Sequence, residues 1–189
     1  MYFLEHFYRK TVKYDLINKF FYNKTKNFPK IKKIVLNFGC KTTEIRDLSS
    51  SLLALELITN KKGSLTFTKQ PNIFLKIRKG HPVGCKVTLK KKQMFNFLEK
   101  ILIEIFPKIK NFNGFLVNKK LKKNAFSYEL HNTFAFNELE EHYYLFNKLP
   151  NLKVTIITQS KTKEELIFIL KSLQFPIKNK SKYNSIGRV

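Results

Sequence analysis

The chain is poor in acidic residues. It has 13 Asp and Glu against 37 Lys and Arg among 189 residues, which leaves a formal net charge of +24. Ordinary domains mix both signs of charge on their surface, so an excess this one-sided indicates a polyanionic partner rather than a device for solubility. Nucleic acid and anionic lipid are the two classes of partner that fit, and both bind in a salt-dependent way.

Cysteine and long apolar runs are also scarce. Two cysteines, Cys40 and Cys85, are too few for a disulfide scaffold and favour a reducing compartment. No window approaches the roughly 20 apolar residues that a bilayer span requires, so we expect no membrane insertion. The N-terminus lacks the features of a secretory signal or a transit peptide, which predicts work in the compartment of synthesis. The lack of Trp beside abundant Phe, Ile, Lys and Asn is typical of an AT-rich genome.

Motifs for metal or phosphate binding are missing too. His81 and Cys85 stand four residues apart, but Gly80, Pro82 and Gly84 around them predict a turn and not a ligand-bearing helix face. No second His/Cys pair completes a zinc set, and no glycine-rich phosphate loop occurs. We therefore expect no metal and no cofactor.

The acidic residues gather at one place. Glu138, Glu140 and Glu141 stand beside His142 and could suggest a carboxylate site. Two tyrosines follow, and no nucleophile, base and orienting group are assembled, so a solvated face or a protein-docking patch is the better interpretation. The sequence predicts a protein that is not an enzyme.

What is present is a set of periodic segments in a chain long enough for one domain with a real core. Apolar spacing predicts helices over residues 2–22 and 48–58, a helix from Met94 that Pro107 stops, and a last helix opened by a capping box of Thr162 and Glu165. Alternation predicts strands over residues 31–38, 64–69 and 154–158, with further strand structure within residues 125–136. Residues 109–124 are expected to form a long loop, and residues 178–189 a basic tail that is disordered alone.

Residues 76–90 alternate cations or hydroxyls with apolar residues on either side of the Gly/Pro turn. This pattern predicts a hairpin with one apolar side and one positive side, on which Lys76, Arg78 and Lys86 share a face that lies on phosphates. The alternative is a peripheral polybasic protein on anionic membrane, which would need a cationic amphipathic helix. The N-terminal helix is the one candidate, and Glu5 and Asp15 dilute its charge.

Several collinear motifs then resemble a known family. They are Phe-Pro-Lys-Ile-Lys-Lys-Ile-Val-Leu-Asn-Phe-Gly at residues 28–39, the basic hairpin at 76–89, Phe-Pro-Lys-Ile-Lys-Asn-Phe-Asn-Gly at 106–114 and Val-Thr-Ile-Ile-Thr at 154–158. From about residue 4 to residue 177 the chain resembles the L5 family of large-subunit ribosomal proteins, of bacterial or mitochondrial type.

The resemblance implies an α+β fold, with a mainly antiparallel sheet, helices packed on one face and long basic loops. It implies a single domain over residues 1–177, followed by the tail at 178–189. Members of the family are structural constituents of the central protuberance, where they bind 5S rRNA or other large-subunit rRNA and lie beside neighbouring large-subunit proteins. They also face the peptidyl-site tRNA and touch a small-subunit head protein across an intersubunit bridge.

Carried over to this chain, the resemblance implies three groups of contact residues. For rRNA they are Asn37, Lys76, Arg78, Lys79, His81, Lys86, Thr88 and Lys90. For the tRNA-facing loop they are Gln70, Asn72 and Phe74, and for a further rRNA contact by the tail Lys178, Lys180, Lys182 and Arg188.

Two departures from the family pattern modify these expectations. The loop at residues 70–75 is shorter than in the family and lacks a cation, which predicts weaker tRNA contact. Asn137 replaces a proline next to the bridge-facing segment, so the local geometry there is expected to differ. The composition favours synthesis inside a mitochondrion, with a bacterial cytoplasm or a plastid as alternatives.

Overall fold

A five-stranded antiparallel sheet is the centre of the fold. The computed structural model describes residues 3–22, 24, 27–40, 44–74, 77–110, 112–116 and 122–178. The strands are β1 (Ile31–Gly39), β2 (Ser64–Phe67), β3 (Pro82–Leu89), β5 (Ala125–Leu130) and β6 (Leu152–Thr158), in the spatial order β2-β3-β1-β6-β5. Every neighbouring pair is antiparallel.

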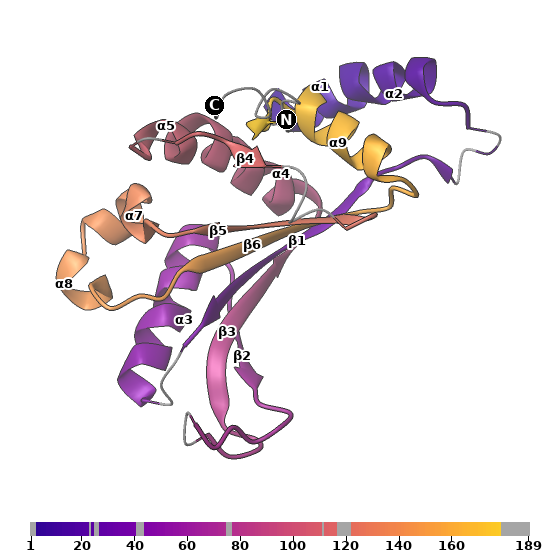
Figure 1. The fold of residues 1–189 in the computed structure, drawn as a ribbon. Coiled ribbons are helices and arrows are strands. Elements are labelled where there is room, and N and C mark those ends of the chain that lie inside the picture. The colour runs from indigo at the N-terminus through magenta and orange to yellow at the C-terminus, as the bar shows by residue number, and fades with distance from the viewer. Residues whose placement is uncertain are drawn as a thin grey trace, which may run out of the picture.

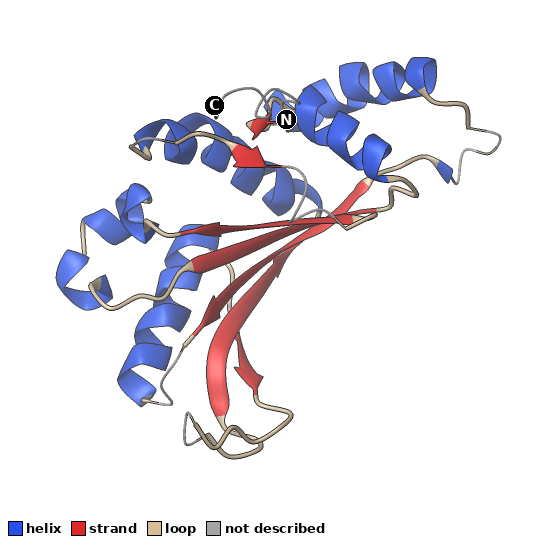
Figure 2. Cartoon of the chain, viewed as in Figure 1, coloured by secondary structure: helices blue, strands red, loops and turns tan. Residues whose placement is uncertain are grey.

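Helices cover one face of this sheet (Figure 1). The N-terminal helix comprises α1 (Phe3–Phe7), a π-helical turn η1 (Tyr8–Val12) and α2 (Lys13–Lys19). The others are α3 (Ile45–Thr59), the continuous helix formed by α4 (Lys91–Lys100), η3 (Ile101–Ile105) and α5 (Phe106–Lys108), and then η4 (Thr133–Ala135), α7 (Asn137–Glu140), α8 (Tyr143–Phe146) and α9 (Lys163–Ser172). A parallel pair of short strands, β4 (Phe115–Leu116) and β7 (Ile177–Lys178), completes the described part. The α+β fold with helices on one face is confirmed (Figure 2).

The period of two along the strands explains why one face is covered. In β1, Ile34, Leu36 and Phe38 are fully buried, whereas the residues between them stay partly exposed. Their partners in the neighbouring strands are apolar as well, because Leu36 lies in register with Val87 of β3 and Val154 of β6. The apolar side therefore forms the floor of the core, against which the helices bury their own apolar stripes.

The predicted capping box is confirmed at the start of α9. The Thr162 side chain accepts a hydrogen bond from the Glu165 amide, and the Glu165 carboxylate accepts one from the Thr162 amide. The helix that Pro107 was expected to stop ends one residue later, at Lys108. Pro107 lies in the last turn of the continuous helix, which ends directly after it.

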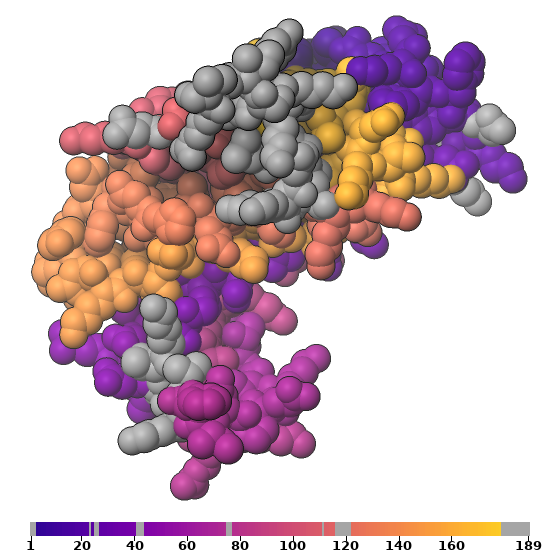
Figure 3. Space-filling model, viewed as in Figure 1, coloured from indigo at the N-terminus to yellow at the C-terminus, as the bar shows by residue number. Residues whose placement is uncertain are grey.

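The predicted hairpin is wrong in its first arm. β3 pairs with β2, and not with residues 76–79. Arg78 lies in the connection between β2 and β3, where its carbonyl accepts a hydrogen bond of 2.8 Å from the Thr68 hydroxyl. Lys76 lies outside the described residues. β2 and the described part of its connection to β3 project from the rest of the molecule (Figure 3, magenta).

Candidate nucleic-acid interface

The uncovered side of the sheet, called here the outer face, carries mostly polar side chains. Its polar members are Lys33 and Asn37 of β1, Ser64 and Thr66 of β2, Lys86 and Thr88 of β3, Ser127 and Glu129 of β5, and Lys153 and Thr155 of β6. The register also places Val35, Ala125 and Ile157 on this face. They come from alternate positions of each strand, opposite to the buried ones. All five strands contribute to one continuous surface.

A row of polar residues crosses the outer face at Asn37. This amide lies in register with Lys86 on one side and with Lys153 on the other. Because neighbouring strands lie about 4.8 Å apart, the two lysine stems begin roughly 10 Å from each other. An amide that both donates and accepts hydrogen bonds thus stands between two ammonium groups that prefer phosphate.

Hydroxyl groups form the next row. Thr88 and Thr155 lie in register with Val35 from opposite sides, and Ser127 lies beyond Thr155. The Ser127 and Thr155 hydroxyl oxygens are 3.0 Å apart and share a hydrogen bond. The carbonyl of Thr88 accepts a 2.8 Å hydrogen bond from the Lys61 ammonium, which brings a further cation close to β3. Such groups suit contact with sugar and base edges.

Little negative charge opposes the lysines of the outer face. Within the described residues, Glu129 is the acidic side chain of this face, and it lies in register with Lys153. Lys86 is exposed and lies between Ser64 and Asn37. The ion pairs found in the described part of the chain, Glu5 with Arg9 and Glu138 with Lys100, lie elsewhere. The face is therefore free to bind an anionic partner.

A hollow of about 530 Å³ opens where β1 ends and β6 begins. Asn37, Glu129 and Lys153 line it together with Asp47 of α3, and with Lys148 and Pro150 from the connection before β6. The hollow thus combines hydrogen-bond donors and acceptors with the apolar ring of Pro150. It can take up a group larger than a phosphate, such as an unstacked base.

The predicted rRNA-binding residues divide into two groups. Asn37, Lys86 and Thr88 come together on the outer face, and Lys90 directly follows β3 at the start of α4. The remaining described members, Arg78, Lys79 and His81, are exposed in the connection between β2 and β3 and not in the sheet.

The predicted tRNA-facing loop has an apolar tip. Gln70, Asn72 and Phe74 are exposed, and the side chains of Ile73 and Phe74 are 90% and 99% accessible. Two backbone hydrogen bonds of 2.9 and 3.0 Å between Asn72 and Ile77 close the loop below this tip. Three exposed cations, Lys69, Arg78 and Lys79, lie at the base of the loop.

Sequence reasoning missed the contribution of β6 and β5 to this surface. Lys153 and Thr155 alternate with buried Leu152, Val154 and Ile156. Thr155 lies in the segment predicted as a strand, residues 154–158, whereas β6 begins two residues earlier and so includes Lys153. Lys178 is exposed in β7, whereas Lys180, Lys182 and Arg188 lie outside the described residues.

The Cys85 thiol is buried behind the outer face, whereas Cys40 is partly exposed and lines the hollow beside Asn37. Both contact the Ser51 hydroxyl oxygen, Cys85 at 3.2 Å and Cys40 at 3.5 Å. Burial raises the pKa of the Cys85 thiol to about 11. Within the described residues, no cluster of three metal-ligating side chains occurs, and no helix is long and apolar enough to cross a membrane.

Comparison with known proteins places this geometry in context. Residues 82–177 match the sequence profile of the C-terminus of the ribosomal L5 protein family. The chain is 34% identical over 176 residues to the large ribosomal subunit protein uL5m of Reclinomonas americana, covering 92% of this chain and 97% of that protein. It is 33% identical over 175 residues to uL5 of Nitrosomonas europaea, with 92% and 97% covered. The uL5 of Wigglesworthia glossinidia brevipalpis is 34% identical over 174 residues, with 91% and 97% covered.

Proposed function

Because the chain belongs to the L5 family of large-subunit ribosomal proteins, we propose that its outer face binds rRNA in the central protuberance. The family is structural and non-enzymatic, so the prediction that the chain is not an enzyme is confirmed by membership. The chain is a structural component of the large ribosomal subunit and acts in translation, with ribosomal RNA and other ribosomal components as partners. The proposal concerns which RNA it binds and through which surface.

The uncovered sheet carries this proposal. The outer face joins Lys86 and Lys153, two ammonium groups for phosphates, to Asn37 and a row of hydroxyls for bases and sugars. Phosphate contacts supply most of the affinity of such a surface, whereas contacts to base edges select the sequence. The hollow beside Asn37 provides room for one unstacked base of 5S rRNA or of its substitute.

Two further contacts extend the proposal across the subunit interface. The loop between β2 and β3 faces the peptidyl-site tRNA, with Arg78 and Lys79 at its base as phosphate contacts and Phe74 at its tip. The tip itself has no described cation, so it contributes less to phosphate binding than the base does. The segment of α7 and α8, which includes Asn137, faces a protein of the small-subunit head.

The composition favours a mitochondrial ribosome and an organelle-encoded chain, because Phe, Ile, Lys and Asn dominate as in AT-rich genomes. Relatives named uL5m and uL5 are compatible with a mitochondrial ribosome and with a bacterial cytoplasm. In either setting, the basic tail at residues 178–189 is proposed to add an rRNA contact through its cations.

The salt dependence of binding tests the proposal. We expect the double variant Lys86→Ala/Lys153→Ala to bind a 5S rRNA transcript more weakly, with a logarithmic salt slope lower by roughly 0.7 to 0.9 for each lost phosphate contact. The control is Lys163→Ala, which removes an exposed cation from the first turn of α9, on the helical side. An unchanged slope in the double variant, or an equal change in the control, would show that binding does not use the outer face.

A further inference from the structure

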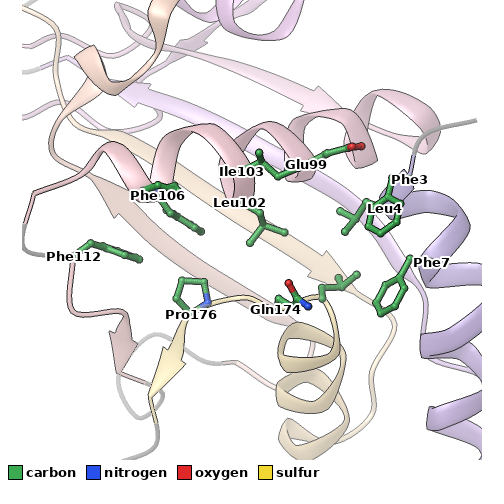
Figure 4. A pocket seen from close by; sticks show the side chains of 12 residues that line it. Phe3, Leu4, Phe7, Glu99, Leu102, Ile103, Phe106, Phe112, Gln174 and Pro176 are labelled. Atoms are coloured by element: carbon green, nitrogen blue, oxygen red, sulfur yellow. The ribbon is translucent and has the colours of Figure 1, made fainter.

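A groove of about 430 Å³ lies on the helical side of the molecule, opposite to the outer face. Leu4 and Phe7 of α1 form one end of it, and Leu102 and Phe106 of the long helix form its roof. The floor is the turn after α9, which includes Pro176. In Figure 4, Leu102 and Phe106 point from the helix into the space above Gln174 and Pro176.

The walls of the groove leave large apolar side chains open to water. Phe3 is 70% exposed at one end, and Ile103 is 64% exposed along the helix, while both line the groove. Scattered apolar residues on a surface are ordinary, but a concave set of them around a cavity marks a docking site. The size of the cavity suits the anchoring side chains of a peptide.

The charge around the groove is opposite to that of the whole protein. Among the described residues that line it, Glu99 is the one charged side chain, although the chain carries 37 Lys and Arg. An adjoining hollow shares Glu99 and Ile103 with the groove and adds Glu104, Glu138 and Lys100. Lys100 already pairs with Glu138, so the Glu99 and Glu104 carboxylates remain as the acidic edge.

One carboxylate oxygen at this edge is held without a partner. The Oε2 atom of Glu99 is buried and makes no hydrogen bond within the described part of the chain. A buried carboxylate oxygen left in this way costs free energy, which an incoming donor would recover once the Glu99 side chain turns this oxygen toward the groove. RNA offers phosphates at its surface, which the acidic edge repels and which no described lysine or arginine of the groove attracts.

We propose that this groove binds an apolar, cation-bearing segment of a neighbouring protein. One or two apolar side chains of that segment enter between Phe7, Leu102 and Phe106, and a Lys or Arg next to them reaches Glu99. The partner is thus defined by an apolar side chain next to a Lys or Arg. The inference goes beyond the proposed function and does not depend on it, since the groove and the outer face lie on opposite sides of the sheet.

Site-specific photocrosslinking in large ribosomal subunits that contain the chain tests the occupant. A benzophenone amino acid replaces Ile103 in one variant and Ile45, which is 84% exposed on α3, in the control. We expect the probe at position 103 to crosslink a ribosomal protein peptide that combines apolar residues with Lys or Arg, and the probe at position 45 not to reach that peptide. A crosslink to rRNA, to residues 179–189 of the same chain or to a second copy, or no crosslink at all, would overturn the proposal.

Charge reversal at the edge supplies the second measurement. A fluorescent peptide of Leu, Phe and Lys should bind the purified protein, and the same peptide with Glu in place of Lys should not. Glu99→Lys should weaken binding of the basic peptide by about tenfold, a loss typical of one charge contact at an interface. Ile103→Asn, which removes an exposed apolar wall residue without adding charge and leaves the core intact, should also weaken binding of the basic peptide. Equal binding of both peptides, or unchanged binding in both variants, would refute a cation-selective groove.

Discussion

Gly84 is the position at which the sheet tolerates least change. It lies inside β3, in register with Gly39 of β1 and Thr66 of β2. A Cβ atom built on Gly84 would lie 2.3 Å from the carbonyl oxygen of Phe38 and 3.1 Å from the Thr66 hydroxyl oxygen. Because Cβ atoms essentially never approach closer than 3.0 Å, Gly84→Ala would force a shift of at least 0.7 Å, the difference between 3.0 and 2.3 Å.

The shift must come from backbone, since the first obstacle is the carbonyl oxygen of β1. Overpacking of this kind costs about 1 to 3 kcal/mol, and a weakened ladder hydrogen bond adds about 1 kcal/mol. We therefore expect Gly84→Ala to lower the free energy of unfolding by roughly 2 to 4 kcal/mol. For a chain of this length, the melting temperature should fall by roughly 5 to 15 °C.

Gly39→Ala is the matched control, because it makes the same substitution in the partner strand. No described atom lies within 4 Å of a Cβ built on Gly39, and its φ is not in the left-handed region. Urea unfolding followed by circular dichroism should show less than about 0.5 kcal/mol for this variant. If both variants lose equal stability, or if Gly84→Ala is neutral, the close contact between β1 and β3 is not as described.

Three further outcomes are expected. Thr162→Ala removes the acceptor for the Glu165 amide, 3.2 Å away, and should cost about 1 kcal/mol in urea unfolding. Burial raises the pKa of the Cys85 thiol from 9.0 to about 11, so the unfolded chain loses this proton at lower pH than the folded chain does. The free energy of unfolding should thus fall between about pH 9 and pH 11, and fall less in Cys85→Ala when both are measured by urea titration at fixed pH. Deletion of residues 179–189 should weaken retention on high-salt-washed large subunits, measured by sedimentation, without lowering the melting temperature; equal retention would leave the tail without a role.

The elements that the sequence predicted well are those with strong local signals. β1 alternates from Ile34 to Phe38, after a register shift between Ile31 and Lys33, and α9 begins with a capping box that both side chains complete. The helix from Lys91 continues past the predicted stop at Pro107 by one residue, which is the usual error at a helix end. In these segments the local pattern and the tertiary packing agree.

The hairpin prediction failed because glycine has two uses that a sequence does not distinguish. Gly80 has a positive φ of 83° and lies in the turn, as predicted. Gly84 was also interpreted as a turn residue, yet it lies within β3. Glycine is needed there because the neighbouring backbone of β1 leaves no space for a side chain. β3 starts at Pro82, before the predicted end of the turn, and it pairs with β2. The paired residues, such as Ser64 and Lys86, are too far apart in the sequence for a local pattern to reveal the pairing.

The sequence predicted the part of the candidate interface that lies on β1 and β3, but not the part on β5 and β6. A strand pattern identifies which side chains share a face, but not which strands lie next to one another. Asn37 and Thr88 came from the family resemblance, whereas Lys153 depends on the observation that β6 lies beside β1. The row from Lys86 through Asn37 to Lys153 exists only in the folded sheet, because its members come from three strands that are far apart along the chain.

The sheet separates two kinds of surface that a net charge of +24 does not reveal. On the outer face, lysines stand among amides and hydroxyls, an environment in which phosphate replaces water at little cost. On the helical side, the groove between Phe7 and Phe106 has an acidic edge at Glu99 and no described cation. The RNA contact proposed for the outer face would relieve the self-repulsion of the excess positive charge, and the groove proposed on the helical side would select a cationic partner. One domain can thereby contact a polyanion and a basic protein at the same time without either competing for the other's surface.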